Sequence, residues 1–244
     1  MAAHSFSYYG FFFLGLILIR YLLISGLTYC VFYLPPKQSF ALRQGRRLPP
    51  TAASIQRDIG LSLLAAVVFA LASALVMKAY EQGLTLLYID VGQYGAWYLG
   101  ISFFATLFLQ DTYFYFLHRA FHHPKVFRWA HSGHHRSVIS TPWTSFAFDL
   151  PEALTQALFF VAIVFILPLH LVTVLAILLT MTVWAVWNHL GFTITSSFFL
   201  SQWLGKWLIG PGHHGLHHRR HSQHFGLYFT FWDRLLGTQN LDRE

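Results

Sequence analysis

The chain has 244 residues, of which 55% are hydrophobic, 18% aromatic and only 10% charged. Soluble domains carry about 25% charged residues, so this composition excludes an ordinary soluble domain and indicates a compact bundle of membrane helices. The net charge of +7 would suggest a nucleic-acid partner in a soluble protein, but membrane topology explains it here, so no nucleic acid is expected. The single cysteine, Cys30, excludes a disulfide framework and a cysteine-based metal site.

Four apolar regions are predicted to enter the membrane. Residues 8–34 are long enough to cross a hydrocarbon core of about 30 Å, and we expect a retained helix rather than a cleaved signal peptide. Residues 35–57 follow with five basic residues, no acidic ones and four prolines, which predicts a loop. Residues 59–80 and 94–117 are the second and third spans. Residues 151–188 are almost uncharged around a central Pro168, which predicts a helical hairpin. Its two helices could cross the membrane fully or enter it only partway.

This topology places residues 35–57, 118–150 and 189–244 on one side of the membrane. These segments hold 14 of the 16 Lys and Arg residues, so the positive-inside rule assigns that side to the cytoplasm. Thirteen of the fifteen histidines lie there too; for the others, His4 and His170, we expect hydrogen bonds at the membrane edge.

We therefore predict an all-α integral membrane protein with about four transmembrane helices or helical hairpins and a cytoplasmic, histidine-rich helical cap. Residues 1–93 supply N-terminal membrane helices and a basic loop, and residues 94–244 supply the histidine-rich region with its hairpin and cap, all in one structural domain. The membrane would be a bacterial inner membrane or the endoplasmic reticulum.

The histidines occur in four clusters, HRAFHH, HSGHH, NHLGF and HHGLHHRRHSQH. Residues three or four apart share a helix face, so H-x-x-x-H and the twice-repeated H-x-x-H-H can each aim imidazoles at one point. Nine nitrogens are more than one ion can use, which indicates two metal ions. The nine are His118, His122, His131, His134, His135, His189, His214, His217 and His218.

The ligand type leaves the metal open, because imidazole suits zinc, copper, iron and nickel alike. A carboxylate-bridged di-iron site is excluded, since it needs Glu-x-x-His pairs and none of the three glutamates stands in that pattern.

The order of these histidine motifs, followed by FGLYFTFWDRLLGT, resembles the fatty acid hydroxylase and sterol desaturase superfamily of membrane histidine-box di-iron oxygenases over residues 100 to 240. The resemblance implies an O2-dependent monooxygenase that hydroxylates an unactivated C–H bond of a fatty acyl, sphingoid or sterol lipid, or a desaturase of the same chemistry. It implies the same nine ligands around two iron ions, for which zinc can substitute in recombinant protein. It also implies electrons from NAD(P)H through a separate carrier such as cytochrome b5 or ferredoxin.

Six further residues are candidates for the metal site or its surroundings. Three histidines, His123, His213 and His221, are balanced between metal ligation and ordinary hydrogen bonding. His224 stands where many family members have Asn, and could add a ligand or replace that amide. Asp149 stands where many members have His, and we expect it to orient ligands. Asp111 precedes His118 by two turns, and we hypothesise that it accepts the second ring N–H of a ligand histidine.

A cleft between the helices would admit the lipid to the metal site. Aromatic residues near the predicted spans are candidates for its lining, although membrane-interface aromatics are the commoner explanation. The candidates are Trp97, Tyr113, Trp143, Trp184 and Trp187. Trp232, Asp233 and Arg234 are expected to form a structural corner near the site.

Two other classes of function stay open on the sequence alone. A zinc or nickel transporter would need polar or ionisable residues along its spans, and the predicted spans have few. A bis-histidine haem protein would need histidines facing each other inside the bundle. The carbon attacked, the electron donor and the oligomeric state are not predicted.

Overall fold

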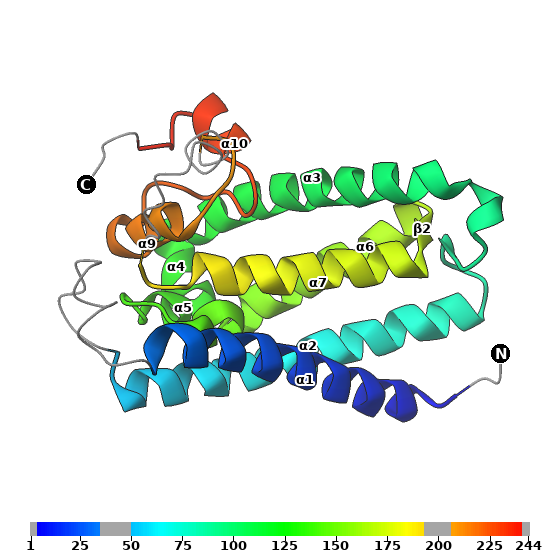
Figure 1. Ribbon diagram of the computed structural model, residues 1–244, viewed down its shortest axis with the longest axis horizontal. Coiled ribbons are helices and arrows are strands. Elements are labelled where there is room, and N and C mark those ends of the chain that lie inside the picture. Colours follow the sequence, from blue (N-terminus) through cyan, green and yellow to red (C-terminus); the bar gives the residue numbers. More distant parts are fainter. Residues whose placement is uncertain (1–3, 35–49, 193–205, 241–244) are drawn as a thin grey trace.

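The structure is a computed structural model that describes residues 4–34, 50–192 and 206–240. Its body consists of long helices that run side by side along the longest axis of the molecule (Figure 1). They are α1 (Phe6–Tyr33), α2 (Ala52–Glu81), α3 (Ala96–Phe121), α6 (Leu150–Ile166) and α7 (Leu171–Asn188). The predicted all-α architecture is confirmed.

Three helices in the described residues, α1, α2 and α7, are long and apolar enough to cross a membrane. The apolar helix α6 has 17 residues, at the lower limit for a span. The predicted third span, α3, is 26 residues long but is not among these three, and it carries the polar residues Gln110 and Asp111 in its buried face. The chain is an integral membrane protein in which α3 turns polar side chains inward and exposes apolar ones such as Phe104.

Small residues allow α1 and α2 to pack closely. Ala66 and Ala70 of α2 lie against Ile17 and Tyr21 of α1 in one buried cluster. Alanine at such positions lets two helix backbones approach, which is how membrane helices associate. The opposite face of α1, including Phe11, is exposed and apolar, as a lipid-facing surface requires.

The predicted hairpin is confirmed by α6 and α7, which are joined by a tight turn at the end of the molecule far from the cap (Figure 1). In this turn, strand β2 (Leu169–His170) pairs in parallel with strand β1 (Leu87–Tyr88), which precedes the short helix η2 (Val91–Gln93). His170 makes the expected hydrogen bonds: its Nε2–H donates to the carbonyl of Ile89, and its Nδ1 accepts from the N–H of Val172.

Short helices gather at the other end of the bundle, where α3 and α7 end and α2 and α6 begin (Figure 1). They are α4 (Pro124–Ala130), α5 (Ser132–His135), η3 (Pro142–Phe146), α9 (Pro211–Arg220) and α10 (Phe231–Leu235). The prediction that residues 118–150 and 189–244 share one end is thus confirmed for the described part. The predicted loop 35–57 is shorter, because α2 begins at Ala52, and its residues 35–49 lie outside the described ones, as do 193–205.

Candidate metal centre

The structure brings all nine of the predicted ligand histidines together, in two adjacent groups. Within each group, one ring nitrogen of every member lies within 4.8 Å of the others. The five-histidine group consists of His118, His122, His131, His135 and His217. The four-histidine group consists of His134, His189, His214 and His218.

Each of the two H-x-x-H-H motifs contributes histidines to both groups. The first gives two histidines to the five-histidine group and one to the four-histidine group, and the second does the reverse. In the motif at α5, His131 and His135 enter the five-histidine group while His134 turns to the other group. In α9 the roles are exchanged: His214 and His218 share the four-histidine group, and the intervening His217 joins the five. Neighbouring helix residues point about 100° apart, so one short helix can face two sites at once.

The ring nitrogens in each group have the spacing of ligands around an ion. In the five-histidine group, Nε2 of His131 lies 3.0 Å from that of His118 and 3.1 Å from that of His135. In the four-histidine group, Nε2 of His189 lies 3.3 Å from that of His134 and 2.9 Å from that of His214. Two nitrogens about 2.1 Å from one ion, at 90 to 105° to each other, are about 3.0 to 3.3 Å apart.

Hydrogen bonds behind the rings fix which nitrogen faces the neighbouring histidines. In four of the nine, Nδ1 lies within hydrogen-bond distance of a backbone carbonyl and must therefore carry the proton. The pairs are His118 with Phe225 at 3.0 Å, His134 with Ala147 at 3.2 Å, His189 with Ala185 at 2.7 Å and His217 with Gln223 at 2.7 Å. Their Nε2 lone pairs then face other imidazole nitrogens at about 3 Å, a repulsive arrangement unless a cation lies between them. The donor set therefore fits a metal ion in each group.

Burial keeps these imidazoles in the neutral form that binds metals. Removal from water, reinforced by neighbouring histidines, lowers the pKa of His214, His217 and His218 well below its ordinary value. The same causes lower the pKa of His189 to about 3. Near neutral pH the rings of His189, His214, His217 and His218 are thus uncharged and present free lone pairs.

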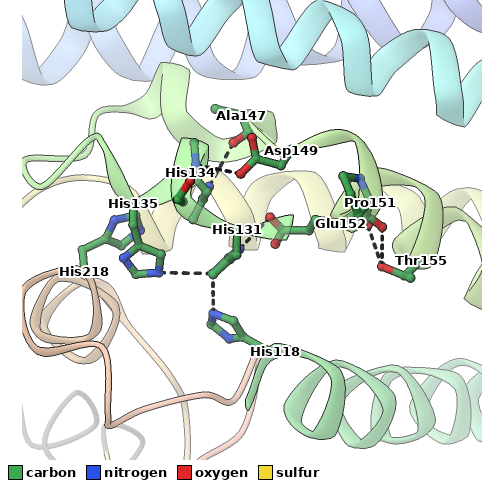
Figure 2. Close-up of polar contacts among 12 residues, drawn as sticks. His118, His131, His134, His135, Ala147, Asp149, Pro151, Glu152, Thr155 and His218 are labelled. Atoms are coloured by element: carbon green, nitrogen blue, oxygen red, sulfur yellow. Dashed lines mark hydrogen bonds and ion pairs between the residues drawn. The ribbon is translucent and has the colours of Figure 1, made fainter. Parts of the chain in front are cut away.

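Glu152 contacts the five-histidine group and was missed in the sequence. Its Oε2 lies 2.7 Å from Nδ1 of His131, and both side chains are 1% exposed (Figure 2). The signal was available: Glu152 is an isolated carboxylate at the start of a nearly uncharged 38-residue segment, where such a group is costly unless it has a partner.

Asp149 acts on the backbone of a histidine motif and not on a ring. Its Oδ2 accepts a hydrogen bond of 2.6 Å from the N–H of Gly133, which lies between His131 and His134 (Figure 2). A side chain on Gly133 would clash with the Asp149 carboxylate. The expectation that Asp149 orients ligands thus holds in an indirect form, through the position of α5.

The hypothesis for Asp111 is wrong. Its Oδ1 accepts hydrogen bonds from three successive backbone N–H groups, those of Leu227, Tyr228 and Phe229, at 3.0, 2.7 and 3.1 Å. The other oxygen, Oδ2, is buried and has no hydrogen-bond partner among the described residues, so neither oxygen accepts from a ligand ring. Asp111 instead holds the loop that carries the carbonyl of Phe225 to His118.

The other four candidate histidines belong to neither group, and His123 uses Nδ1 to accept the N–H of Lys125. His213 uses Nδ1 to accept the N–H of Gly210 at the start of α9, and its ring lies 4.9 Å from that of His224. His224 itself accepts the N–H of Asn240 at Nε2. His221 is exposed, its Nε2 bonds the carbonyl of His218, and its ring lies 4.4 Å from that of His135.

The expected corner is formed by Asp233. Its two carboxylate oxygens accept the N–H groups of Phe225 and Gly226, each at 2.9 Å. Trp232 donates to the hydroxyl of Thr112, and Arg234 lies over the ring of Trp207. The FWDRLLG segment therefore holds the same loop that Asp111 holds from the other side.

A cavity of about 30 Å³ adjoins both groups, large enough for an ion or a water-sized molecule. Its lining combines histidines with apolar and polar side chains. The residues are Phe114, His118, His131, His134, Ser145, Phe148, Glu152, Ala185, Asn188, His189, His214, Gly226 and Leu227.

The five aromatic residues predicted to line the lipid cleft do not line this cavity. Trp97 is 67% exposed at the far end of α3, and Trp187 is 38% exposed. The other three are used in packing between elements. Tyr113 donates its hydroxyl to the carbonyl of Thr155, Trp143 packs against Tyr21, and Trp184 packs against Tyr228.

Comparisons with known proteins agree with this geometry. The model of the fatty acid hydroxylase family matches residues 103–238. The chain is 28% identical over 184 residues to the Delta(7)-sterol 5(6)-desaturase ERG3B of Gibberella zeae, a match that covers 75% of this chain and 55% of that protein. It is 31% identical over 186 residues to the lathosterol oxidase of Homo sapiens, covering 75% of this chain and 60% of the relative. The chain thus spans little more than half the length of these relatives. No solved structure matches it.

Proposed function

Because the chain belongs to the fatty acid hydroxylase family, we propose that it is an O2-dependent oxidoreductase that oxidises a C–H bond of a membrane lipid. One observation carries the proposal: two adjacent groups of largely buried imidazoles direct their nitrogens at each other at the spacing of metal ligands. The two groups would hold two iron ions, which zinc can replace. Bound iron would supply the activation of dioxygen that an unactivated C–H bond demands, since no side-chain acid, base or nucleophile attacks such a bond at neutral pH.

The residues around the cavity would position the reaction and keep bulk water out. Phe114, Phe148 and Leu227 provide apolar walls next to the histidines. The cavity lies at the end of the helix bundle, so a lipid in the bilayer would reach it with one carbon while most of the molecule stays among the helices.

The substrate class and reaction type are inferred from the relatives. The relatives named above are a sterol desaturase and a lathosterol oxidase, so we infer a sterol or a similar lipid as substrate, with desaturation as the favoured outcome and hydroxylation as the alternative. Both begin with removal of one hydrogen atom from carbon. Electrons would come from NAD(P)H through a separate acidic carrier, such as cytochrome b5 or a ferredoxin, docked on the basic cap, which the positive-inside rule assigns to the cytoplasm.

Lipid analysis of an expressing host tests this function. Cells that produce the wild type should contain a sterol or acyl lipid that has lost two hydrogens or gained one oxygen, and cells that produce His134→Ala should not. His123→Ala is the matched control, because His123 is exposed and belongs to neither group. Identical lipid profiles for the wild type and His134→Ala would contradict the proposal.

A further inference from the structure

Glu152 is the feature of the metal centre that neither the histidine motifs nor the family match explains. It begins α6 and reaches back to His131, which is 21 residues earlier in the chain. Among the described residues it is the one carboxylate in contact with a ring nitrogen of either histidine group. A carboxylate so fully removed from water is costly, and the contact with His131 is its compensation.

His131 holds a central place in the five-histidine group. Its Nε2 lies within 3.1 Å of the Nε2 atoms of both His118 and His135, so the orientation of this one ring affects two neighbours. Its Nδ1–H donates to Oε2 of Glu152 at 2.7 Å, as short as the carbonyl contacts of His189 and His217 (Figure 2). A carboxylate behind a metal-binding imidazole fixes the ring and increases the electron density on the opposite nitrogen.

We infer that Glu152 is a positioning residue that makes the two metal sites unequal, by strengthening the ion's hold in the five-histidine group alone. In the four-histidine group, by contrast, the rings of His134 and His189 are fixed by backbone carbonyls, which carry no full charge. Partners of this kind behind a metal ligand typically account for 10- to 100-fold in metal affinity. The inference rests on the proposed function in requiring that the groups bind metal, and it makes no assumption about the substrate.

The test is the affinity of each iron for Glu152→Ala, Glu152→Gln and the wild type, measured by competition with a chelator. Glu152→Ala removes the acceptor, so one iron per chain should bind about 10- to 100-fold more weakly while the other keeps its wild-type affinity. Glu152→Gln keeps an uncharged oxygen that can accept the hydrogen bond from His131. The affinity of its weaker iron site should therefore lie between those of the wild type and Glu152→Ala. Glu81→Gln is the matched control: it removes a carboxylate that pairs with Tyr9 and Lys78 far from the cap, and it should leave both affinities unchanged.

The metal-free proteins separate positioning from folding. Metal-free Glu152→Gln should unfold at the temperature of the metal-free wild type, and the gain in unfolding temperature on adding iron should be smaller for the variant. Equal affinities of both irons in the wild type and the two Glu152 variants would overturn the inference, as would an equal weakening of both irons. A wild type that binds no metal would defeat the proposed function itself; a wild type with two irons and unaffected Glu152 variants would defeat only the role of Glu152.

Discussion

The Nε2 atoms of His134 and His189 lie 3.3 Å apart, although the residues come from different cap and hairpin elements. Each ring is held from behind, His134 by the carbonyl of Ala147 and His189 by that of Ala185. Both unprotonated nitrogens therefore face each other in a fixed orientation. The two rings define a site that is preorganised by the fold for a cation.

Loss of His189 should remove one ion and spare the other. His189→Ala deletes one of four ligands from the four-histidine group and none from the five-histidine group. Elemental analysis should therefore find about one iron per chain in this variant against two in the wild type. The control, His123→Ala, should retain two. Full retention of iron by His189→Ala would show that this ring is not a ligand.

The glycines inside the two H-x-x-H-H helices should respond in opposite ways to a methyl group. Gly133→Ala would push Asp149 away and shift α5, so iron content and turnover should fall. Gly215→Ala meets no atom closer than 3.8 Å in α9, so it should keep its iron and gain up to about 1 kcal/mol of stability from helix propensity. Equal behaviour of the two variants in iron content would contradict the role given to Asp149.

Removal of the Asp111 carboxylate should destabilise the protein. Asp111→Ala leaves three backbone N–H groups of residues 227–229 without their acceptor. Each unsatisfied buried donor costs about 1–3 kcal/mol, so the unfolding free energy should drop by at least about 2 kcal/mol. Asp111→Asn retains an acceptor oxygen and should lose less.

Asp90→Ala is the control for Asp111→Ala, measured by unfolding in the same detergent. Asp90 is exposed and accepts one N–H, that of Gly92, so its loss should cost less than about 1 kcal/mol. An Asp111→Ala variant as stable as Asp90→Ala would show that the loop does not depend on this carboxylate.

The sequence was informative where a pattern repeats along one element. Apolar length predicted α1, α2 and the hairpin, and the spacing of His131, His134 and His135 predicted a shared site, because both depend on local helix geometry. The division into two groups was not predicted. It depends on the angle at which α5 and α9 approach each other, which spacing does not encode.

Contacts between distant segments account for the predictions that were wrong or missing. Asp111 lies on the helix that carries His118, yet its partners are backbone amides more than a hundred residues away. Every residue except proline has a backbone N–H, so the sequence does not indicate which of them a side chain will bind. Trp143 and Trp184 could equally line a cleft or pack between helices until their neighbours are known. Glu152 was visible as a lone carboxylate, but its partner was not.

The iron content of the purified protein, read together with its absorption spectrum, decides whether the two histidine groups hold two iron ions. We expect two irons per chain and no haem band, with the iron lost from a variant in which one histidine of each group, His131 and His214, is replaced by alanine. A haem spectrum, or a wild type reconstituted anaerobically with ferrous iron that binds no more of it than this double variant, would contradict the account.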